Sequence, residues 1–193
     1  MWAGGRLRMR EGGLRVGQTA EKITEEAAPQ EKRSGSVGRF RLVQLHHRYL
    51  VGDQCLLDEV QNLVYHTGGA ERPLRRHPDT SAAAWQDEVD SDEVMLMRYS
   101  ALLGNSHRIH FDHKYATEVE GYPSVVVHGP LLATWIFNSA AQRRPNATQL
   151  TYRAVAPAFV NEHLLVKGNS DCTEAWIERK TDQAMLMKCA FEY

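Results

Sequence analysis

Residues 125–140 read VVVHGPLLATWIFNSA and contain the clearest helix signal in the 193-residue chain. Proline is favoured at the first helical position, so Pro130 predicts a helix that begins near Gly129. The residues that follow at i, i+3 and i+4 spacing form one stripe that we expect to be buried: Leu131, Leu132, Trp135, Ile136, Ser139 and Ala140. Pro145 ends the helix, and about 15 residues at 1.5 Å each make it roughly 22 Å long. A helix of this length can cross a small sheet.

Four strands are expected after this helix, at 149–156, 162–168, 173–179 and 183–193. The last of them alternates most cleanly between its two faces. One face holds Met185, Met187, Cys189, Phe191 and Tyr193. One helix followed by antiparallel strands is typical of an α+β fold in which the sheet wraps around the helix.

The N-terminal part has strand patterns without a comparable helix. Residues 1–15 are typical of a short strand and turn, and the acidic, polar segment 21–36 of an exposed strand or loop edge. Alternation with a period of two predicts a strand at 40–51, and a poorer alternation predicts another at 55–65. We therefore expect an incomplete copy of the same architecture in this part.

Residues 68–92 show no sustained period and contain glycines, prolines and three consecutive alanines, which is typical of a linker. The apolar run at 94–103 then predicts a further strand. We expect the chain to divide into a partial N-terminal half at 1–67, a linker at 68–92, and a complete C-terminal domain with the functional site at 93–193.

Length and composition exclude several classes of protein. A chain of 193 residues predicts one or two domains, and 42% hydrophobic with 24% charged residues is ordinary globular usage. A formal net charge of -1 does not predict a nucleic-acid partner. The three cysteines are widely spaced and odd in number, which favours a reducing compartment. No apolar run reaches the roughly 20 residues that a membrane helix needs.

The segment 99–116, YSALLGNSHRIHFDHKYA, is dense in residues that can do chemistry. Its three histidines and one aspartate are adequate zinc ligands. We do not expect a metal, because no HExxH motif or second ligand cluster occurs and His163 is isolated. The remaining alternative to a reactive site is that these side chains only satisfy the backbone groups of a turn.

The segment 125–130 leads into the N-terminus of the helix, where unpaired N–H groups and the positive end of the helix dipole lie. An oxygen that gains negative charge during a reaction would be stabilised there. Gly129 permits close approach to the backbone because it has no side chain. The alternative is that Gly129 is a plain N-cap.

Together the two segments resemble the MaoC-like hydratase and dehydratase family of the hot-dog superfamily. The stretch GNSHRIH at 104–110 matches the length and the first and last residues of the family loop G-D-x-N-P-x-H, and His128-Gly129 matches its HG. The pattern is similar in particular to double hot-dog hydroxyacyl-thioester dehydratases and to mesaconyl-CoA or itaconyl-CoA hydratases, with VEGYP at 119–123 in register. The resemblance implies a hot-dog fold with a truncated N-terminal half, because WAGG at 2–5 resembles a segment inside that half.

The resemblance also implies roles for individual residues. His110 falls on the family's catalytic histidine, and the N–H of Gly129 would receive the negative charge on a thioester oxygen. The family's acid/base aspartate falls on Asn105, which would orient a water, and its asparagine falls on His107. Because an amide cannot accept a proton at useful pH, another group must replace that aspartate. Asp112 is the first candidate, since in an extended chain it would share a face with His110, and His107 is the second.

The expected reaction is hydration of an enoyl thioester, or the reverse dehydration, on a short acyl-CoA such as mesaconyl-CoA. His107, Arg108, His128 and Arg153 are expected to bind the substrate, the arginines through its anionic groups. The CoA thioester is the substrate, and no cofactor, metal, nucleic acid or membrane is expected. The alternatives are a noncatalytic thioester-binding or partner subunit and a hot-dog acyl-CoA thioesterase. We expect a homodimer in the cytoplasm, with the mitochondrial matrix as the alternative compartment.

Overall fold

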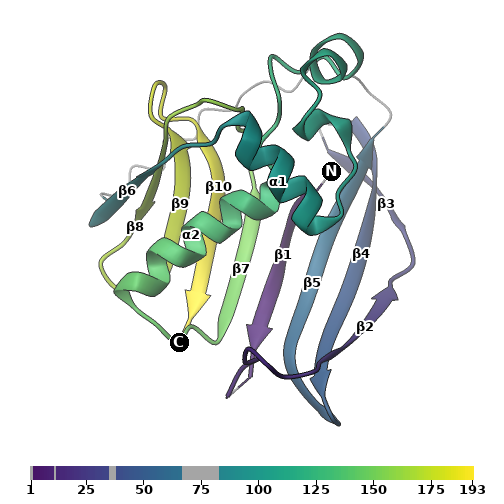
Figure 1. Cartoon of the computed structure of the whole chain (residues 1–193), viewed down its shortest axis with the longest axis vertical. Helices are drawn as coiled ribbons and strands as arrows, with labels where there is room; N and C mark the ends of the chain where they lie inside the picture. The colour runs from purple at the N-terminus through teal and green to yellow at the C-terminus, as the bar shows by residue number, and fades with distance from the viewer. Residues whose placement is uncertain (1, 11, 35–37, 67–82) are drawn as a thin grey trace.

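The computed structural model describes residues 2–10, 12–34, 38–66 and 83–193. In these residues ten strands form one antiparallel sheet, and the helices lie on one side of it (Figure 1). The strands are β1 (Trp2–Met9), β2 (Glu21–Glu26), β3 (Gln30–Ser34), β4 (Gly38–Val51), β5 (Gln54–His66), β6 (Trp85–Val89), β7 (Gln149–Ala154), β8 (Leu164–Gly168), β9 (Glu174–Arg179) and β10 (Met185–Glu192). The helices are α1 (Glu93–Leu103) and α2 (Gly129–Arg143), with a 3-10 turn η1 (Arg108–His110) and a π-helical turn η2 (Tyr115–Val119).

The sheet consists of two halves that join in its middle. The strand order is β2-β4-β5-β1-β7-β10-β9-β8-β6, and β3 pairs with β4. β1 of the N-terminal half pairs antiparallel with β7 of the C-terminal half, with Gly5 opposite Tyr152. An edge that a single half would expose is therefore paired within the chain, so the two halves form one continuous sheet.

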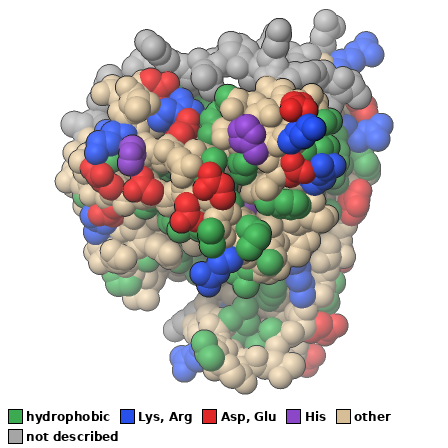
Figure 2. Space-filling view, turned by 45° about the horizontal axis from the view of Figure 1, so that its top comes forward, with side chains coloured by type: hydrophobic (Ala, Val, Ile, Leu, Met, Phe, Trp, Pro, Cys, Tyr) green, Lys and Arg blue, Asp and Glu red, His purple; other side chains and the backbone are tan. Residues whose placement is uncertain are grey.

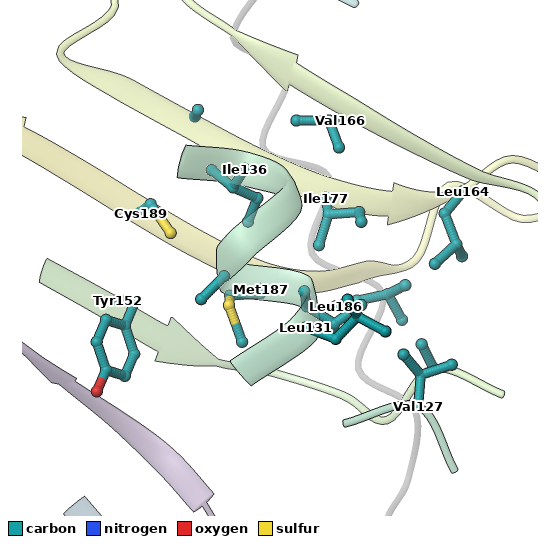
Figure 3. Close-up of a cluster of buried hydrophobic side chains, with 14 of the residues drawn as sticks. Val127, Leu131, Ile136, Tyr152, Leu164, Val166, Ile177, Leu186, Met187 and Cys189 are labelled. Carbon is teal, nitrogen blue, oxygen red and sulfur yellow. The ribbon is translucent and has the colours of Figure 1, made fainter. Parts of the chain in front are cut away.

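Helix α2 lies across the C-terminal half of the sheet and supplies one side of the core (Figures 1 and 3). It forms as predicted, because Pro130 occupies the first turn and the stripe through Ile136 turns toward the strands. Ile136, Ile177 and Met187 are fully buried in the layer between α2 and the sheet. The predicted face of the last strand is confirmed, since Met187, Cys189 and Phe191 all belong to this core.

The N-terminal half forms strands where they were predicted, at β4 and β5, and its described residues contain no helix. The acidic segment 21–36 provides β2 and β3, which pair with β4 at the outer edge of the sheet. Tyr152 points from β7 toward β1 (Figure 3), so one aromatic side chain of the C-terminal half packs on the neighbouring half. The antiparallel sheet with its crossing helix confirms the expected α+β fold.

The prediction of a strand at 94–103 is wrong, because this segment is helix α1. The Asp92 side chain accepts a hydrogen bond from the N–H of the third helical residue, which is an N-cap. Gly104 has the left-handed conformation that ends many helices, with φ 63°. Leu96 and Ser100, four residues apart, are the two buried positions. The apolar residues at 94–103 therefore belong to a helix most of whose side chains are exposed.

The expected linker at 68–92 is also wrong in part, because its residues 85–89 form β6 at the edge of the sheet. Trp85 packs over Gly168 of β8, and its indole N–H donates to the carbonyl of Asn169 at 2.9 Å. Residues 68–82 of the expected linker lie outside the described residues. The division of the chain into domains stays a prediction.

The face of the molecule drawn in Figure 2 shows no separation of charge. In Figure 2 acidic and basic side chains lie close to one another over most of the face that it draws, in keeping with the formal net charge of -1. None of the helices in the described part of the chain is both long and apolar enough to cross a membrane.

Candidate active site

His110 lies at the end of the turn η1 and is held as a neutral imidazole with a defined tautomer. Its Nδ1 lies 2.7 Å from the carbonyl oxygen of Val126. Because a carbonyl can only accept, the ring proton is on Nδ1 and the lone pair is on Nε2. The side chain is 8% exposed, and burial lowers its pKa to about 4. A neutral imidazole with a free Nε2 is a base at ordinary pH.

His128, the residue before helix α2, packs directly against His110. The two rings are stacked with their centroids 3.8 Å apart and an angle of 16° between their planes. The Nε2 atom of His128 lies 2.9 Å from the hydroxyl of Ser100, and the edge of Tyr99 contacts the ring. Burial, followed by the neighbouring His110, lowers the pKa of His128 to about 3. The turn that holds His110, helix α1 and the N-terminus of α2 therefore meet at this pair of rings.

Gly129 is the first residue of α2, and an aromatic side chain covers it. A Cβ atom at this position would lie 2.6 Å from Cε3 of Trp2, which is closer than real side chains approach one another. Trp2 in turn stacks on Tyr152, with ring centroids 4.3 Å apart. Glycine is therefore needed here for packing against Trp2, a reason that adds to the unpaired N–H groups of the helix N-terminus.

Asn105 organises the loop that leads to His110. Its side-chain oxygen accepts a hydrogen bond from the backbone N–H of His107 at 3.0 Å. The amide NH2 group has no partner among the described residues. The oxygen of Asn105 thus fixes the loop, while the NH2 group retains two donors for a water or a substrate.

Asp112 does not lie in an extended segment, contrary to the expectation from the sequence. The turn η1 precedes it, so the alternation that would place it on the face of His110 does not apply. Its carboxylate pairs with Arg108 at 2.6 Å and accepts the backbone N–H of Tyr115 at 2.9 Å. The Tyr115 N–H and the Arg108 guanidinium lower the pKa of Asp112, so it is a stable carboxylate.

The other residues expected to bind substrate lie at different distances from the ring pair. The His107 ring contacts His110 edge-on, with centroids 6.0 Å apart, and is more than half exposed. Arg108 lies over the ring of Tyr115 at 4.4 Å and is engaged with Asp112. Arg153 follows Tyr152 in β7, so it projects from the opposite face of the sheet to the one that packs against α2.

Sequence reasoning missed Ser100 and Tyr99 as neighbours of His128, and Trp2 as the neighbour of Gly129. Ser100 and Tyr99 come from α1, which was interpreted as a strand. The i, i+4 spacing of Leu96 and Ser100 after a capping aspartate would have placed the serine on the buried face of a helix. Trp2 is 126 positions from His128, so no local signal joins them, and only the β1–β7 pairing brings it to α2.

Neither of two described cavities includes the ring pair. One of about 200 Å³ lies by the C-terminal end of α2, against Arg144 and Phe191. A shallow one of about 390 Å³ lies between Pro123, Phe159 and Arg179. Over the described residues no group of three or more histidine, cysteine, aspartate or glutamate side chains is arranged to hold a metal ion.

Comparison with known proteins gives related sequences with named activities. The chain is 34% identical over 177 residues to mesaconyl-C(4)-CoA hydratase of Chloroflexus aurantiacus, an alignment that covers 89% of this chain and 62% of that protein. The chain thus spans less than two thirds of this relative's length.

Solved structures show the same fold at low sequence identity. The crystal structure of HtdX from Mycobacterium tuberculosis superposes with a TM-score of 0.77 at 16% identity, over 100% of this chain and 74% of that one. A second Mycobacterium tuberculosis protein, described as having a double hot-dog fold, superposes with a TM-score of 0.60 at 16% identity, over 99% of this chain and 74% of that one. The expected hot-dog fold is confirmed.

The family assignment comes from a sequence model. Residues 1–160 match the model of hydroxyacyl-thioester dehydratase type 2. The match therefore includes the segment 99–116, the stacked residues His110 and His128, and the N-terminus of α2. It covers well over half of the 193 residues. The chain belongs to the hydroxyacyl-thioester dehydratase type 2 family.

Proposed function

We propose that this chain is a hydro-lyase that adds water to, or removes it from, the carbon–carbon double bond of an enoyl thioester. The observation that supports it most is the tautomer of His110. The ring donates Nδ1–H to Val126 and keeps a free Nε2 lone pair, and it stacks on the residue that precedes the N-terminus of α2. A base thereby lies beside the positive end of a helix.

In the hydration direction the steps follow from this arrangement. Nε2 of His110 takes a proton from water while the water oxygen bonds to the β-carbon. Electrons of the double bond move toward the thioester oxygen, whose negative charge the N–H of Gly129 stabilises. The imidazolium then returns the proton to the α-carbon. The sum is addition of one water, and dehydration is the same sequence reversed.

Asn105 occupies the position of the family aspartate but has a different role in this mechanism. Its NH2 group donates to the attacking water and orients it, but it cannot accept the proton. His110 therefore serves as base and acid in turn. Burial keeps the ring neutral before the reaction, so Nε2 is available to accept a proton, and the low pKa favours return of that proton from the imidazolium.

For the substrate we propose a short acyl-CoA, which could carry a carboxylate as a mesaconyl group does. The support is the 34% identity to mesaconyl-C(4)-CoA hydratase, together with Arg108 beside the site. If Arg108 pairs with the acyl carboxylate, Arg108→Lys will impair mesaconyl-CoA turnover more than crotonyl-CoA turnover, because lysine cannot form the bidentate pair. An equal loss on both substrates would remove this role.

One experiment separates the hydro-lyase from the thioesterase and the binding subunit. The protein is incubated with crotonyl-CoA and with mesaconyl-CoA, and enoyl absorbance and free thiol are followed together. The proposed function predicts loss of absorbance without thiol release. Thiol release would show hydrolysis, and an unchanged substrate that still binds would show a noncatalytic thioester-binding protein.

A homodimer also stays a proposal. The described residues of the N-terminal half contain no helix of their own, and a second copy would bury sheet surface that such a helix would otherwise cover. Light scattering coupled to gel filtration tests it, with a mass of about twice the 21.9 kDa chain expected.

A further inference from the structure

One polar atom of the stacked His110–His128 pair is buried without a partner among the described residues. The Nδ1 atom of His128 makes no hydrogen bond in the described structure, and the side chain is only 1% exposed. Leaving such an atom unpaired costs about 1–3 kcal/mol. His128 precedes α2, but its ring does not cap that helix. The atom is therefore free for a partner that the described residues do not supply.

The proton on this ring can be assigned from Ser100. The Ser100 hydroxyl has no other side-chain hydrogen bond within the described part of the chain than its 2.9 Å contact with Nε2 of His128. Its O–H proton is satisfied only if the hydroxyl donates to Nε2. A neutral imidazole holds one proton, so that proton lies on Nδ1. Nδ1 of His128 is thus a hydrogen-bond donor without an acceptor among the described residues.

The position of this donor matches the reaction. Its ring is stacked on the His110 base, 3.8 Å away, and its own backbone joins directly to Gly129 at the N-terminus of α2. An enoyl thioester that places its β-carbon near a base must place its carbonyl oxygen a few atoms further on. The two rings present complementary groups, because His110 offers a lone pair and His128 offers an N–H.

We propose that His128 is a second catalytic donor, whose Nδ1–H binds the thioester carbonyl oxygen together with the backbone N–H of Gly129, and that Ser100 is the positioning residue that fixes its tautomer. This inference rests on the hydro-lyase function proposed above. The sequence predicted only a general substrate-binding role for His128. The proposal assigns the binding to its Nδ1–H and the bound group to the thioester carbonyl oxygen. A buried neutral donor aimed at a developing oxyanion contributes typically 10²–10³ in rate.

Two isosteric substitutions test the assignment, because asparagine places an amide NH2 donor near the Nδ1 position, while glutamine places its amide oxygen, which can accept from Ser100, near Nε2. His128→Asn retains the proposed donor and loses the contact with Ser100. His128→Gln retains that contact and loses the donor. We expect kcat to fall by at least about a hundredfold in His128→Gln and by less than about tenfold in His128→Asn, with smaller changes in KM.

Controls make both outcomes decisive. His163→Gln applies the same exchange to an exposed histidine and should leave kcat unchanged. Thermal melts identify a variant that does not fold, in which case Ser100→Ala replaces it, with an intermediate loss of kcat expected because the tautomer is no longer fixed. Equal losses in His128→Asn and His128→Gln, or near-native kcat in His128→Gln, would overturn the inference.

A second readout separates this inference from the function on which it rests. The infrared C=O stretch of bound crotonyl-CoA should lie below its value in solution and shift back in His128→Gln but not in His128→Asn. If the wild-type protein binds crotonyl-CoA without turnover and still shows this pattern, the hydro-lyase function fails and the donor stands. If no difference between the variants appears, the donor fails whatever the activity.

Discussion

The imidazoles of His110 and His128 lie face to face, 3.8 Å apart and tilted by only 16°. Burial disfavours a charge on either ring, and a charge on one would repel a charge on the other. A backbone carbonyl partner, Val126, and a hydroxyl partner, Ser100, then fix where each proton lies. Three segments of the chain are thereby joined into one neutral unit beside the N-terminus of α2.

Replacing His110 with alanine should lower kcat by about a hundredfold or more, because the variant has no group to take the proton from water. Steady-state kinetics with crotonyl-CoA measure the effect. His113→Ala, an exposed histidine three residues away, serves as the matched control. Near-native turnover in His110→Ala would remove this residue from the mechanism.

Stability should fall as the pH drops below about 6.5. In the folded protein the pKa of His110 is about 4 and that of His128 about 3, whereas both are near 6.5 in the unfolded chain. Between these pKa values the unfolded state binds more protons than the folded state, so the free energy of unfolding increases with pH. The stability that the two neutral rings contribute is therefore lost as the pH falls from about 6.5 toward 4. The slope should be on the order of 1 kcal/mol per pH unit for each ring.

Urea unfolding at pH 7.5, 6.5, 5.5 and 4.5 measures this dependence. The pKa of His47 is also lowered by burial, so it contributes in the same direction. For that reason the decisive comparison is with His110→Ala, whose pH slope should be visibly smaller than that of the wild-type protein. The same slope in both proteins would contradict the assigned pKa of His110.

A methyl group at position 129 should destabilise the protein through Trp2. The added Cβ would lie 2.6 Å from the indole, and overpacking of this kind costs typically 1–3 kcal/mol. The φ of Gly129 is not in the left-handed region, so the backbone itself tolerates alanine. The cost should largely disappear when Trp2 is also replaced by alanine. Urea unfolding of Gly129→Ala, Trp2→Ala, the double variant and the wild-type protein forms the cycle.

An unchanged cost of Gly129→Ala in the Trp2→Ala background would show that the indole is not the obstacle. The same four proteins also report on the helix N-terminus, because the double variant keeps the backbone N–H of residue 129. If that N–H stabilises the thioester oxygen, the double variant should retain more activity than Gly129→Ala alone.

The sequence predicted those elements whose own residues set the pattern. The stripe of α2, the alternation of β10 and the approximate bounds of β4 and β5 are local properties, and all were found. Helix α1 was not, because a run of apolar residues from Val94 to Leu103 satisfies the strand pattern as well as the helix pattern. Only its two ends, Asp92 and Gly104, distinguish a helix.

In the site, too, only features set by local sequence could be predicted. His110 and His128 could be placed together because a family motif names both, whereas their stacking and tautomers depend on the partners Val126 and Ser100. The role of Trp2 depends on the pairing of β1 with β7, which no local pattern contains. The prediction that Asp112 shares a face with His110 assumed an extended chain, but a turn precedes Asp112.

The cap of α1 offers a last test, because this helix delivers Ser100 to His128. Asp92→Ala removes the side-chain oxygen that accepts the N–H of Met95, and should lower the free energy of unfolding by about 0.5–2 kcal/mol. Asp92→Asn is the matched control, since asparagine caps equally well but has no charge, and it should cost only the dipole contribution of a few tenths of a kcal/mol. Thermal and urea unfolding compare the three proteins. If asparagine destabilises as much as alanine, the carboxylate charge and not the hydrogen bond holds the start of α1, and the position of Ser100 depends on ionic strength.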